Sequence, residues 1–157
     1  MSKLIGDRLP AAVFQAFDGN DLERKIGPAY LLITSDPDGT ARPCMLSAGE
    51  ILALDDKRIR VALWPRSNTS ANLARGSPAL LCYVVHDSAL YVKGIPRALG
   101  KAARSRLERF EIEVRSVESD IHPGMPVNEG ITFALEGATP AEVAATWHEQ
   151  VEGLREG

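Results

Sequence analysis

The sequence has few cysteines and no long apolar run, and each absence argues against a class of protein. Its two cysteines, Cys44 and Cys82, lie far apart and belong to no Cys-x-x-Cys pair. We therefore expect buried free thiols rather than a disulfide framework. The longest apolar stretches are strand-sized, well below the roughly 20 residues that span a bilayer, and the first residues show no signal-peptide pattern. The protein is therefore expected to be cytoplasmic, without a membrane partner.

Charge of one sign is not concentrated anywhere in the chain. The 157 residues include 18 Lys and Arg against 21 Asp and Glu, a net charge of −3, and the basic residues are dispersed. This distribution argues against a nucleic acid as the partner. The length and the 45% share of hydrophobic residues suit one globular domain over residues 1–157. We expect its core at 29–136 and a C-terminal helix at 140–155.

The common catalytic and metal-binding motifs are also missing. His86, His122 and His148 do not have the spacing of metal ligands, so no metal site is predicted. There is no Gly-x-Ser-x-Gly motif, no Gly-x-Gly-x-x-Gly after a strand and no Walker loop. A hydrolase with its own acid, base and nucleophile is difficult to assemble from these parts, and no catalytic residue is assigned.

Short β-rich runs separated by turn residues dominate the middle of the chain. Turns at Ser35–Gly39 and Asp87-Ser88 predict two hairpins. The expected strands are residues 29–34, 40–47, 58–63, 79–86, 89–95, 110–115 and 131–135. Six or seven such strands joined as hairpins predict a mainly β, antiparallel barrel with appended helices. A doubly wound parallel sheet would need regular strand–helix alternation, which is absent.

Individual residues predict the surroundings of these strands. Arg58 and Arg60 alternate with apolar residues, which is the pattern of a half-buried strand. Pro43 predicts an edge strand or a bulge, because proline cannot donate to the ladder. Gly94 predicts a bulge or a close approach of another backbone segment.

Helices are expected around the barrel, and the last has the clearest signals. The expected helices are residues 7–17, 67–75, 101–109 and 140–155. Thr139, Pro140 and Glu142 provide an N-cap, a first-turn proline and a capping box for the C-terminal helix. Apolar residues then repeat at helical spacing and form a packing face: Val143, Trp147, Val151 and Leu154.

The segment Arg66–Leu73 is the main candidate for a binding site. Hydroxyl, amide and guanidinium groups gather there, at a junction between a strand and a helix. The first turn of a helix offers unpaired N–H groups and the positive end of the dipole, which suit a phosphate. The alternative is that Ser67 or Asn68 only caps the helix and the other groups are polar surface.

The block from Tyr30 to Ile95 resembles the pyridoxamine 5'-phosphate oxidase-like FMN-binding split β-barrel family. The resemblance covers the middle two-fifths of the chain, and it is the order of its parts that is informative. Those parts are Gly39–Pro43, the strand Val61–Trp64 leading into Ser67-Asn68-Thr69, and Asn72-Leu73 with Ser77-Pro78 before the strand Ala79–Tyr83.

That resemblance implies an FMN site and assigns residues to it. Arg42 and Ser47 would face the cofactor, and the backbone at Leu63 and Trp64 would run beside the isoalloxazine. Ser67, Asn68 and Thr69 would hold the phosphate. Members that bind FMN firmly often carry Arg and Lys where this chain has Asn68 and Thr69, so Arg66 would supply the charge.

The resemblance also implies a function. We expect an FMN-binding oxidoreductase that forms a homodimer with the cofactor at the interface and acts on an unidentified small molecule. Two alternatives remain open: a non-catalytic flavin- or haem-binding module, and a deazaflavin-dependent reductase. Pyridoxamine phosphate is not the expected substrate, because the resemblance does not reach the C-terminal region.

Three further residues have two interpretations each. Trp64 could stack on the flavin or pack at the end of a strand. For Trp147, packing on the helix face is favoured, because its neighbours one turn away are apolar. His122 lies in a loop, 120–130, that is rich in proline and glycine, and it could contact a ligand or simply be exposed.

Overall fold

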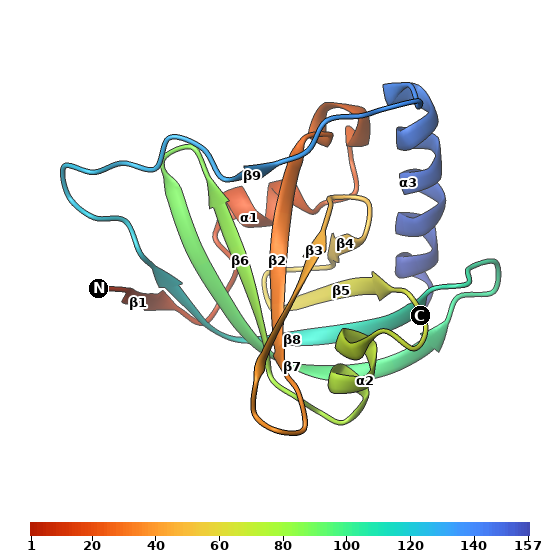
Figure 1. Cartoon of the computed structure of the whole chain (residues 1–157), viewed down its shortest axis with the longest axis horizontal. Helices are drawn as coiled ribbons and strands as arrows, with labels where there is room; N and C mark the ends of the chain where they lie inside the picture. The colour runs from red at the N-terminus through yellow and green to blue at the C-terminus, as the bar shows by residue number, and fades with distance from the viewer.

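Nine strands and three α-helices make up the fold, and the computed structural model describes every residue from Met1 to Gly157 (Figure 1). The strands are β1 Lys3–Gly6, β2 Pro28–Ser35, β3 Ala41–Leu46, β4 Ile51–Ala53, β5 Arg58–Leu63, β6 Ala79–Val85, β7 Ser88–Lys101, β8 Glu108–Ser119 and β9 Ile131–Thr132. The helices are α1 Ala11–Ala16, α2 Asn68–Ala74 and α3 Pro140–Arg155, and a short 3₁₀ helix, Leu22–Lys25, follows α1.

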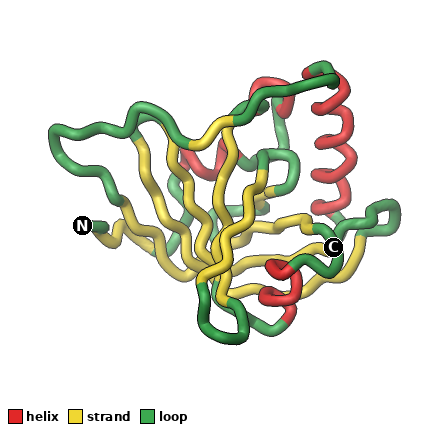
Figure 2. The backbone as a smooth tube through the Cα atoms, viewed as in Figure 1, coloured by secondary structure: helices red, strands yellow, loops and turns green.

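The strands form one antiparallel sheet that curls on itself (Figure 2). Seven strands follow in the order β3-β2-β6-β7-β8-β5-β4, while β1 pairs with β8 and β9 with β2. Laid flat, seven strands are about 29 Å wide. The four-residue connection from β3 to β4 spans at most roughly 18 Å, so the sheet must curl. The predicted mainly β fold with six or seven antiparallel strands, flanking helices and a C-terminal helix is confirmed.

Local sequence signals explain several features of this sheet. The turn at Ser35–Gly39 joins β2 to β3, and β3 is an edge strand, as Pro43 requires. At Gly94 the pairing of β7 with β8 shifts register. A Cβ atom there would lie 2.6 Å from the carbonyl oxygen of Glu113, so the close approach predicted for this glycine is confirmed.

The helix predicted at 101–109 is wrong. Strand β7 continues to Lys101, and β8 begins at Glu108, opposite it in the same hairpin. The eleven residue pairs that join β7 and β8 outweigh the weak helical preference of the connecting residues. The strand expected at 131–135 is also shorter than predicted, because β9 contains only Ile131 and Thr132.

Two hydrophobic clusters lie on the two faces of the curled sheet. The larger fills the barrel and includes Phe17, Tyr30 and Tyr83, whose rings stack or meet edge to face. The smaller lies outside the barrel, between β4, β5 and helix α3. Strand β5 is therefore buried on both faces beyond Arg58, and the half-buried strand predicted from its alternation is wrong. The helix covers the face that Arg60 occupies.

Helix α3 begins and packs as its sequence predicts. The capping box of Thr139 and Glu142 is present, and Trp147, Val151 and Leu154 are buried. The indole of Trp147 lies over Gly49, where an added Cβ would be 2.1 Å from the ring. The absence of a side chain at Gly49 therefore allows the helix to approach the barrel closely.

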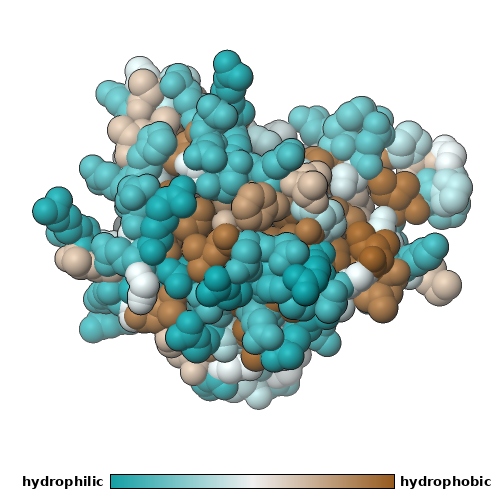
Figure 3. All heavy atoms as spheres, turned by 180° about the vertical axis from the view of Figure 1, so that it is seen from behind, coloured by the Kyte–Doolittle hydropathy of each residue, from teal (hydrophilic) through white to brown (hydrophobic).

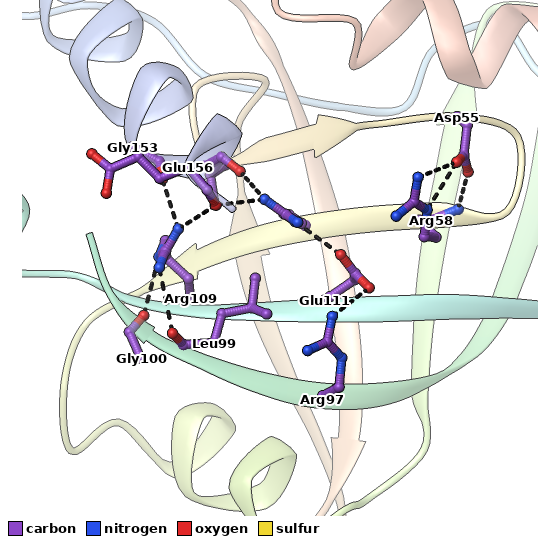
Figure 4. Close-up of polar contacts among 11 residues, drawn as sticks. Asp55, Arg58, Arg97, Leu99, Gly100, Arg109, Glu111, Gly153 and Glu156 are labelled. Atoms are coloured by element: carbon purple, nitrogen blue, oxygen red, sulfur yellow. Dashed lines mark hydrogen bonds and ion pairs between the residues drawn. The ribbon is translucent and has the colours of Figure 1, made fainter. Parts of the chain in front are cut away.

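Two buried arginines from neighbouring strands hold the C-terminal end of α3 (Figure 4). Arg60 of β5 donates from Nη1 to the carbonyl oxygens of Leu154 and Glu156, at 2.9 and 2.7 Å. Arg109 of β8 donates from Nη1 to those of Gly153 and Glu156, at 3.1 and 2.8 Å. The last carbonyls of a helix lack partners and carry the negative end of the dipole, so both guanidinium groups stabilise this end.

Glu111 supplies the carboxylate for this group of buried charges. Its Oε2 accepts from Nε of Arg60, and its Oε1 accepts from Nη2 of Arg97, both at 2.9 Å (Figure 4). Burial opposes ionisation of Glu111, but hydrogen bonds from Arg97 and Arg60 outweigh it, and the pKa lies below its ordinary value. The carboxylate therefore stays charged and balances Arg60 beneath the helix.

Several large apolar side chains remain on the surface. Hydrophobic residues form patches between hydrophilic ones across the face seen in Figure 3. The exposed large hydrophobic residues are Met1, Leu4, Ile5, Met45, Trp64, Ile95, Ile121, Met125 and Ile131. None of the helices combines the length and the apolar character needed to cross a membrane.

We predict that Arg109→Met lowers the free energy of unfolding by about 2–4 kcal/mol, because the carbonyl oxygens of Gly153 at the end of α3 and of Gly100 in β7 lose the donors that Arg109 supplies. Arg115→Met is the matched control on the same strand. Arg115 is 55% exposed and should cost less than about 1 kcal/mol. Urea unfolding of the three proteins measures the difference, and equal losses in the two variants would contradict a special role for Arg109.

The lowered pKa of Glu111 predicts a loss of stability in acid. A carboxyl whose pKa is lowered by folding stabilises the fold above its unfolded-state value, and this stabilisation disappears as the pH falls through the folded-state value. Between about pH 6 and pH 3 the wild type should therefore lose more stability than Glu111→Gln. Urea unfolding over this pH range measures both slopes, and parallel slopes would disprove the contribution of Glu111.

Candidate functional site

A cavity of about 240 Å³ lies at the end of β5. In the ribbon, this end of the strand lies between helices α2 and α3 (Figure 1). Strand β3, the end of β5, the start of α2, the residue before β8 and helix α3 all contribute to its walls. Seven lining residues are apolar or weakly polar: Cys44, Met45, Leu46, Ala62, Leu63, Trp64 and Leu107. Four are polar: Glu50, Ser67, Thr69 and Gln150. A mostly apolar wall with a few polar groups is typical of small-molecule sites.

A strained turn connects β5 to α2 at the edge of this cavity. The backbone N–H of Ser67 donates to the carbonyl oxygen of Trp64, with Pro65 and Arg66 between them. Proline at the second position and a left-handed residue at the third are typical of a type II turn, in which glycine is usual at the third. Here the third residue is Arg66, with φ of 64°. Backbone strain of this kind is often found at functional sites.

Two hydroxyl groups follow the turn. The Oγ of Ser67 accepts a hydrogen bond from the backbone N–H of Ser70 and so caps α2, which leaves its own O–H free to donate. Thr69 is buried, and its hydroxyl contacts the thiol of Cys44. Burial raises the pKa of Cys44, with Glu50 adding to the effect, although the hydrogen bond to Thr69 opposes it. The thiol is therefore protonated at neutral pH and is a poor nucleophile.

Glu50 joins the cavity to a second hollow beside it. Its Oε2 accepts from the backbone N–H and the Oγ of Ser47, at 2.6 and 2.9 Å. Ser47 lines the second hollow, of about 320 Å³, which also shares Met45 and Leu46 with the first. The two hollows therefore lie side by side along the end of β3.

Gln150 provides the polar group of the cavity that lacks a partner. Its residue lies on α3, on the face that also carries Trp147, Val151 and Leu154. The Oε1 atom is shielded from solvent and is the only buried side-chain nitrogen or oxygen in the chain without a hydrogen bond. A buried acceptor without a donor is unfavourable, so this atom indicates where a ligand group could donate.

The structure brings together five of the eight residues predicted from the sequence. Leu63, Trp64, Ser67 and Thr69 line the cavity, and Ser47 lines the adjoining hollow. The exposed Arg66 and Asn68 lie beside these residues in the chain without lining either space.

Arg42 lies apart from this group. Its guanidinium binds the carboxylate of Asp36 with Nε and Nη2, at 2.7 to 3.2 Å. Asp36 also accepts from Asn72 of α2. Arg42 is thus bound within the hairpin of β2 and β3 rather than free in the cavity.

Seven of the eleven lining residues were not predicted from the sequence: Cys44, Met45, Leu46, Glu50, Ala62, Leu107 and Gln150. Leu107 and Gln150 lie far from the 30–95 block, and only the folded chain brings them to the cavity. A polar residue on the apolar face of the C-terminal helix was the one available signal for Gln150. Trp147 is buried and packs against Phe133, as favoured. His122 is exposed and lines neither hollow.

Comparison with known sequences identifies a relative that aligns with nearly the whole chain. It is the uncharacterized protein YclD of Bacillus subtilis (strain 168), 34% identical over 153 residues, which cover 96% of each chain. The chain belongs to the YclD family. No protein-family profile matches the sequence.

Comparison with solved structures confirms the fold of this YclD-family chain. A proposed pyridoxamine 5'-phosphate oxidase of Lactobacillus delbrueckii superimposes with a TM-score of 0.58 at 18% identity, covering 74% of this chain and 98% of the other. HupZ of Group A Streptococcus superimposes with a TM-score of 0.53 at 15% identity, with the same coverage. The resemblance to the pyridoxamine 5'-phosphate oxidase-like split-barrel family is thus confirmed in the fold, and identities this low establish the fold alone.

We predict that Arg66→Gly raises the free energy of unfolding of this YclD-family protein by about 0.5–1 kcal/mol. Glycine adopts the left-handed conformation without the cost that other residues carry, although it also makes the unfolded chain more flexible. Arg104→Gly is the control, because Arg104 is also an exposed loop arginine but has no positive φ. Thermal or urea unfolding compares them, and destabilisation by Arg66→Gly would show that the turn is not strained.

Proposed function

We propose that the chain is an FMN-binding oxidoreductase whose flavin occupies the cavity at the end of β5. The observation that carries the proposal is the composition of this cavity. Apolar side chains form most of its wall, two hydroxyl groups lie where α2 begins, and a shielded amide oxygen lacks a donor. A flat ring system with hydrogen-bonding groups on its edge and a phosphate at one end matches these features.

Each part of the ligand has residues that could hold it. The hydroxyl groups of Ser67 and Thr69 would donate hydrogen bonds to the phosphate, and the exposed Arg66 before them would add positive charge. Leu63 and Leu107 would cover the ring and exclude water from it. Trp64, which is 68% exposed beside the cavity, offers an aromatic face for stacking. The residues present therefore fit an FMN.

The flavin, when bound, would supply hydride and electron transfer, and the chain would bind and orient it. This division of roles suits the side chains in the cavity. The thiol of Cys44 is held in its protonated form, and the one carboxylate, Glu50, is bound to Ser47. Neither group is arranged as a nucleophile with an adjacent base.

The proposal includes a second copy of the chain that closes the site. At about 240 Å³ the cavity is smaller than the roughly 300–1,000 Å³ of typical small-molecule sites. Met45 and Trp64 on its walls are 58% and 68% exposed. Large apolar side chains that are exposed next to one another favour a protein interface at this place. A symmetric dimer would cover them and enlarge the enclosed space.

A deazaflavin-dependent reductase is the second candidate. It is favoured by the neutral Asn68 and Thr69, which stand where firm FMN binders of the resembled family often carry Arg and Lys. A non-catalytic flavin- or haem-binding module is the third, since the cavity offers binding groups but no assigned catalytic residue. Titration with FMN, a deazaflavin and haem ranks the three ligands, and reduction of the bound flavin by NADH or NADPH separates an enzyme from a binding module.

We predict that the purified protein binds FMN and that Thr69→Val weakens this binding about tenfold, because a hydrogen bond to a charged phosphate is lost. Riboflavin lacks the phosphate, so its affinity should be the same in both proteins. Flavin fluorescence quenching measures both affinities, and sedimentation tests for the dimer. Thr146→Val, an exposed site on α3, is the control and should change neither affinity.

Two results would contradict this prediction. A protein that takes up no FMN would disprove the FMN assignment. Equal losses of FMN and riboflavin affinity in Thr69→Val would show that Thr69 supports the cavity wall rather than the phosphate.

A further inference from the structure

The side-chain amide of Gln150 is held at the cavity without a partner. Its Oε1 is the only buried side-chain acceptor of the chain that receives no hydrogen bond, although nearly all such groups in folded proteins are paired. The other polar lining groups have partners: Glu50 binds Ser47, Ser67 caps α2 and Thr69 contacts Cys44. The Oε1 of Gln150 is therefore the buried acceptor of this cavity that the chain itself leaves without a donor.

The position of Gln150 is fixed by the docking of α3. Trp147 and Val151, on either side of it in the helix, are buried against the barrel. Arg60 and Arg109 hold the end of the helix one turn further on. Because the helix is anchored on both sides of this residue, the backbone of Gln150 is held beside the cavity that its side chain lines.

An unpaired carbonyl oxygen in an apolar cavity selects for a ligand that carries an N–H or O–H donor. A flavin has such a group on the edge of its ring, the N3–H between two carbonyls. An amide presents an acceptor beside a donor, which complements this edge. A haem has no N–H at its periphery, so it would leave Oε1 unsatisfied.

We propose that Gln150 recognises the imide edge of the flavin ring, accepting from N3–H, and so selects flavins and deazaflavins over ligands without this edge. This inference rests on the proposed flavin site. It assigns a specificity-determining role to a residue of the C-terminal helix, outside the 30–95 block on which the sequence resemblance depends.

The test compares FMN with N3-methyl FMN, in which the donor is replaced by a methyl group. The wild type should bind the methylated flavin about tenfold more weakly than FMN. In Gln150→Leu the two flavins should bind with similar affinity, because the acceptor is gone. Glu149→Leu, an exposed neighbour on the same helix, is the control and should keep the wild-type preference.

A second readout needs no ligand. Gln150→Leu removes a buried unpaired acceptor, so the melting temperature of the ligand-free protein should rise by about 2–4 °C, while the stabilisation gained on adding FMN should shrink. A purely structural Gln150 would instead give a lower melting temperature in Gln150→Leu.

The outcomes separate this inference from the proposed function. If FMN binds and the wild type does not distinguish the methylated flavin, or if Gln150→Leu keeps the preference, the role of Gln150 is disproved and the flavin site stands. If the wild type binds neither flavin, both proposals fail. Loss of the preference in Gln150→Leu alone, together with a raised melting temperature, supports the assignment.

Discussion

The docking of helix α3 on the outside of the barrel depends on two arginines beneath its last turn. Arg60 and Arg109 project from adjacent strands on the face that would otherwise meet water, and each donates to two carbonyl oxygens of the helix end. Buried guanidinium groups are unfavourable unless all their donors are used. Glu111 supplies the balancing charge for Arg60, the helix end supplies acceptors to both arginines, and the carbonyl oxygens of Leu99 and Gly100 in β7 supply the others for Arg109. The guanidinium groups on the strands and the carbonyl oxygens at the helix end therefore form their hydrogen bonds only when the helix is docked on the strands.

This interaction also determines the shape of the candidate site. Helix α3 carries Gln150 to the cavity and Trp147 to the adjoining hollow, so both walls exist only when the helix is docked. The close approach at Gly49 determines how near the helix can come to the end of β3. A substitution under the helix should thus alter the cavity as well as the stability. The site is built across the two hydrophobic clusters rather than within one of them.

Much of the fold could be predicted from the sequence, because its signals are local. The turn at Ser35–Gly39, the edge position of Pro43, the bulge at Gly94 and the cap at Thr139 each depend on a few neighbouring residues. The predictions were wrong where contacts between distant parts of the chain determine the local structure. Because Lys101 pairs with Glu108 in the hairpin of β7 and β8, residues 101–109 form strand and turn where a helix was expected. The alternation of Arg60 could not show that a helix 80 residues later covers its face.

The same distinction applies to the candidate site. The strand-to-helix junction placed Leu63, Trp64, Ser67 and Thr69 together, because they follow one another in the chain. Arg42 was expected beside them, but Asp36 in the same hairpin binds its guanidinium. Leu107 and Gln150 come from elements that only the folded chain brings to this place. Pattern analysis identifies the contiguous side of such a site and misses the opposite wall.

The features of the site that disfavour folding support its interpretation as functional. A left-handed Arg66, an unpaired Oε1 on Gln150 and a largely exposed Trp64 all lie at or beside one cavity. Glycine in place of Arg66, leucine in place of Gln150 and a polar residue in place of Trp64 would each favour folding of the chain on its own. Natural sequences usually agree with their fold at every level, and local disagreements concentrate at functional sites. A ligand that pairs the amide and a second subunit that covers the indole would remove two of these three conflicts, which is the strongest physical argument that the cavity is used.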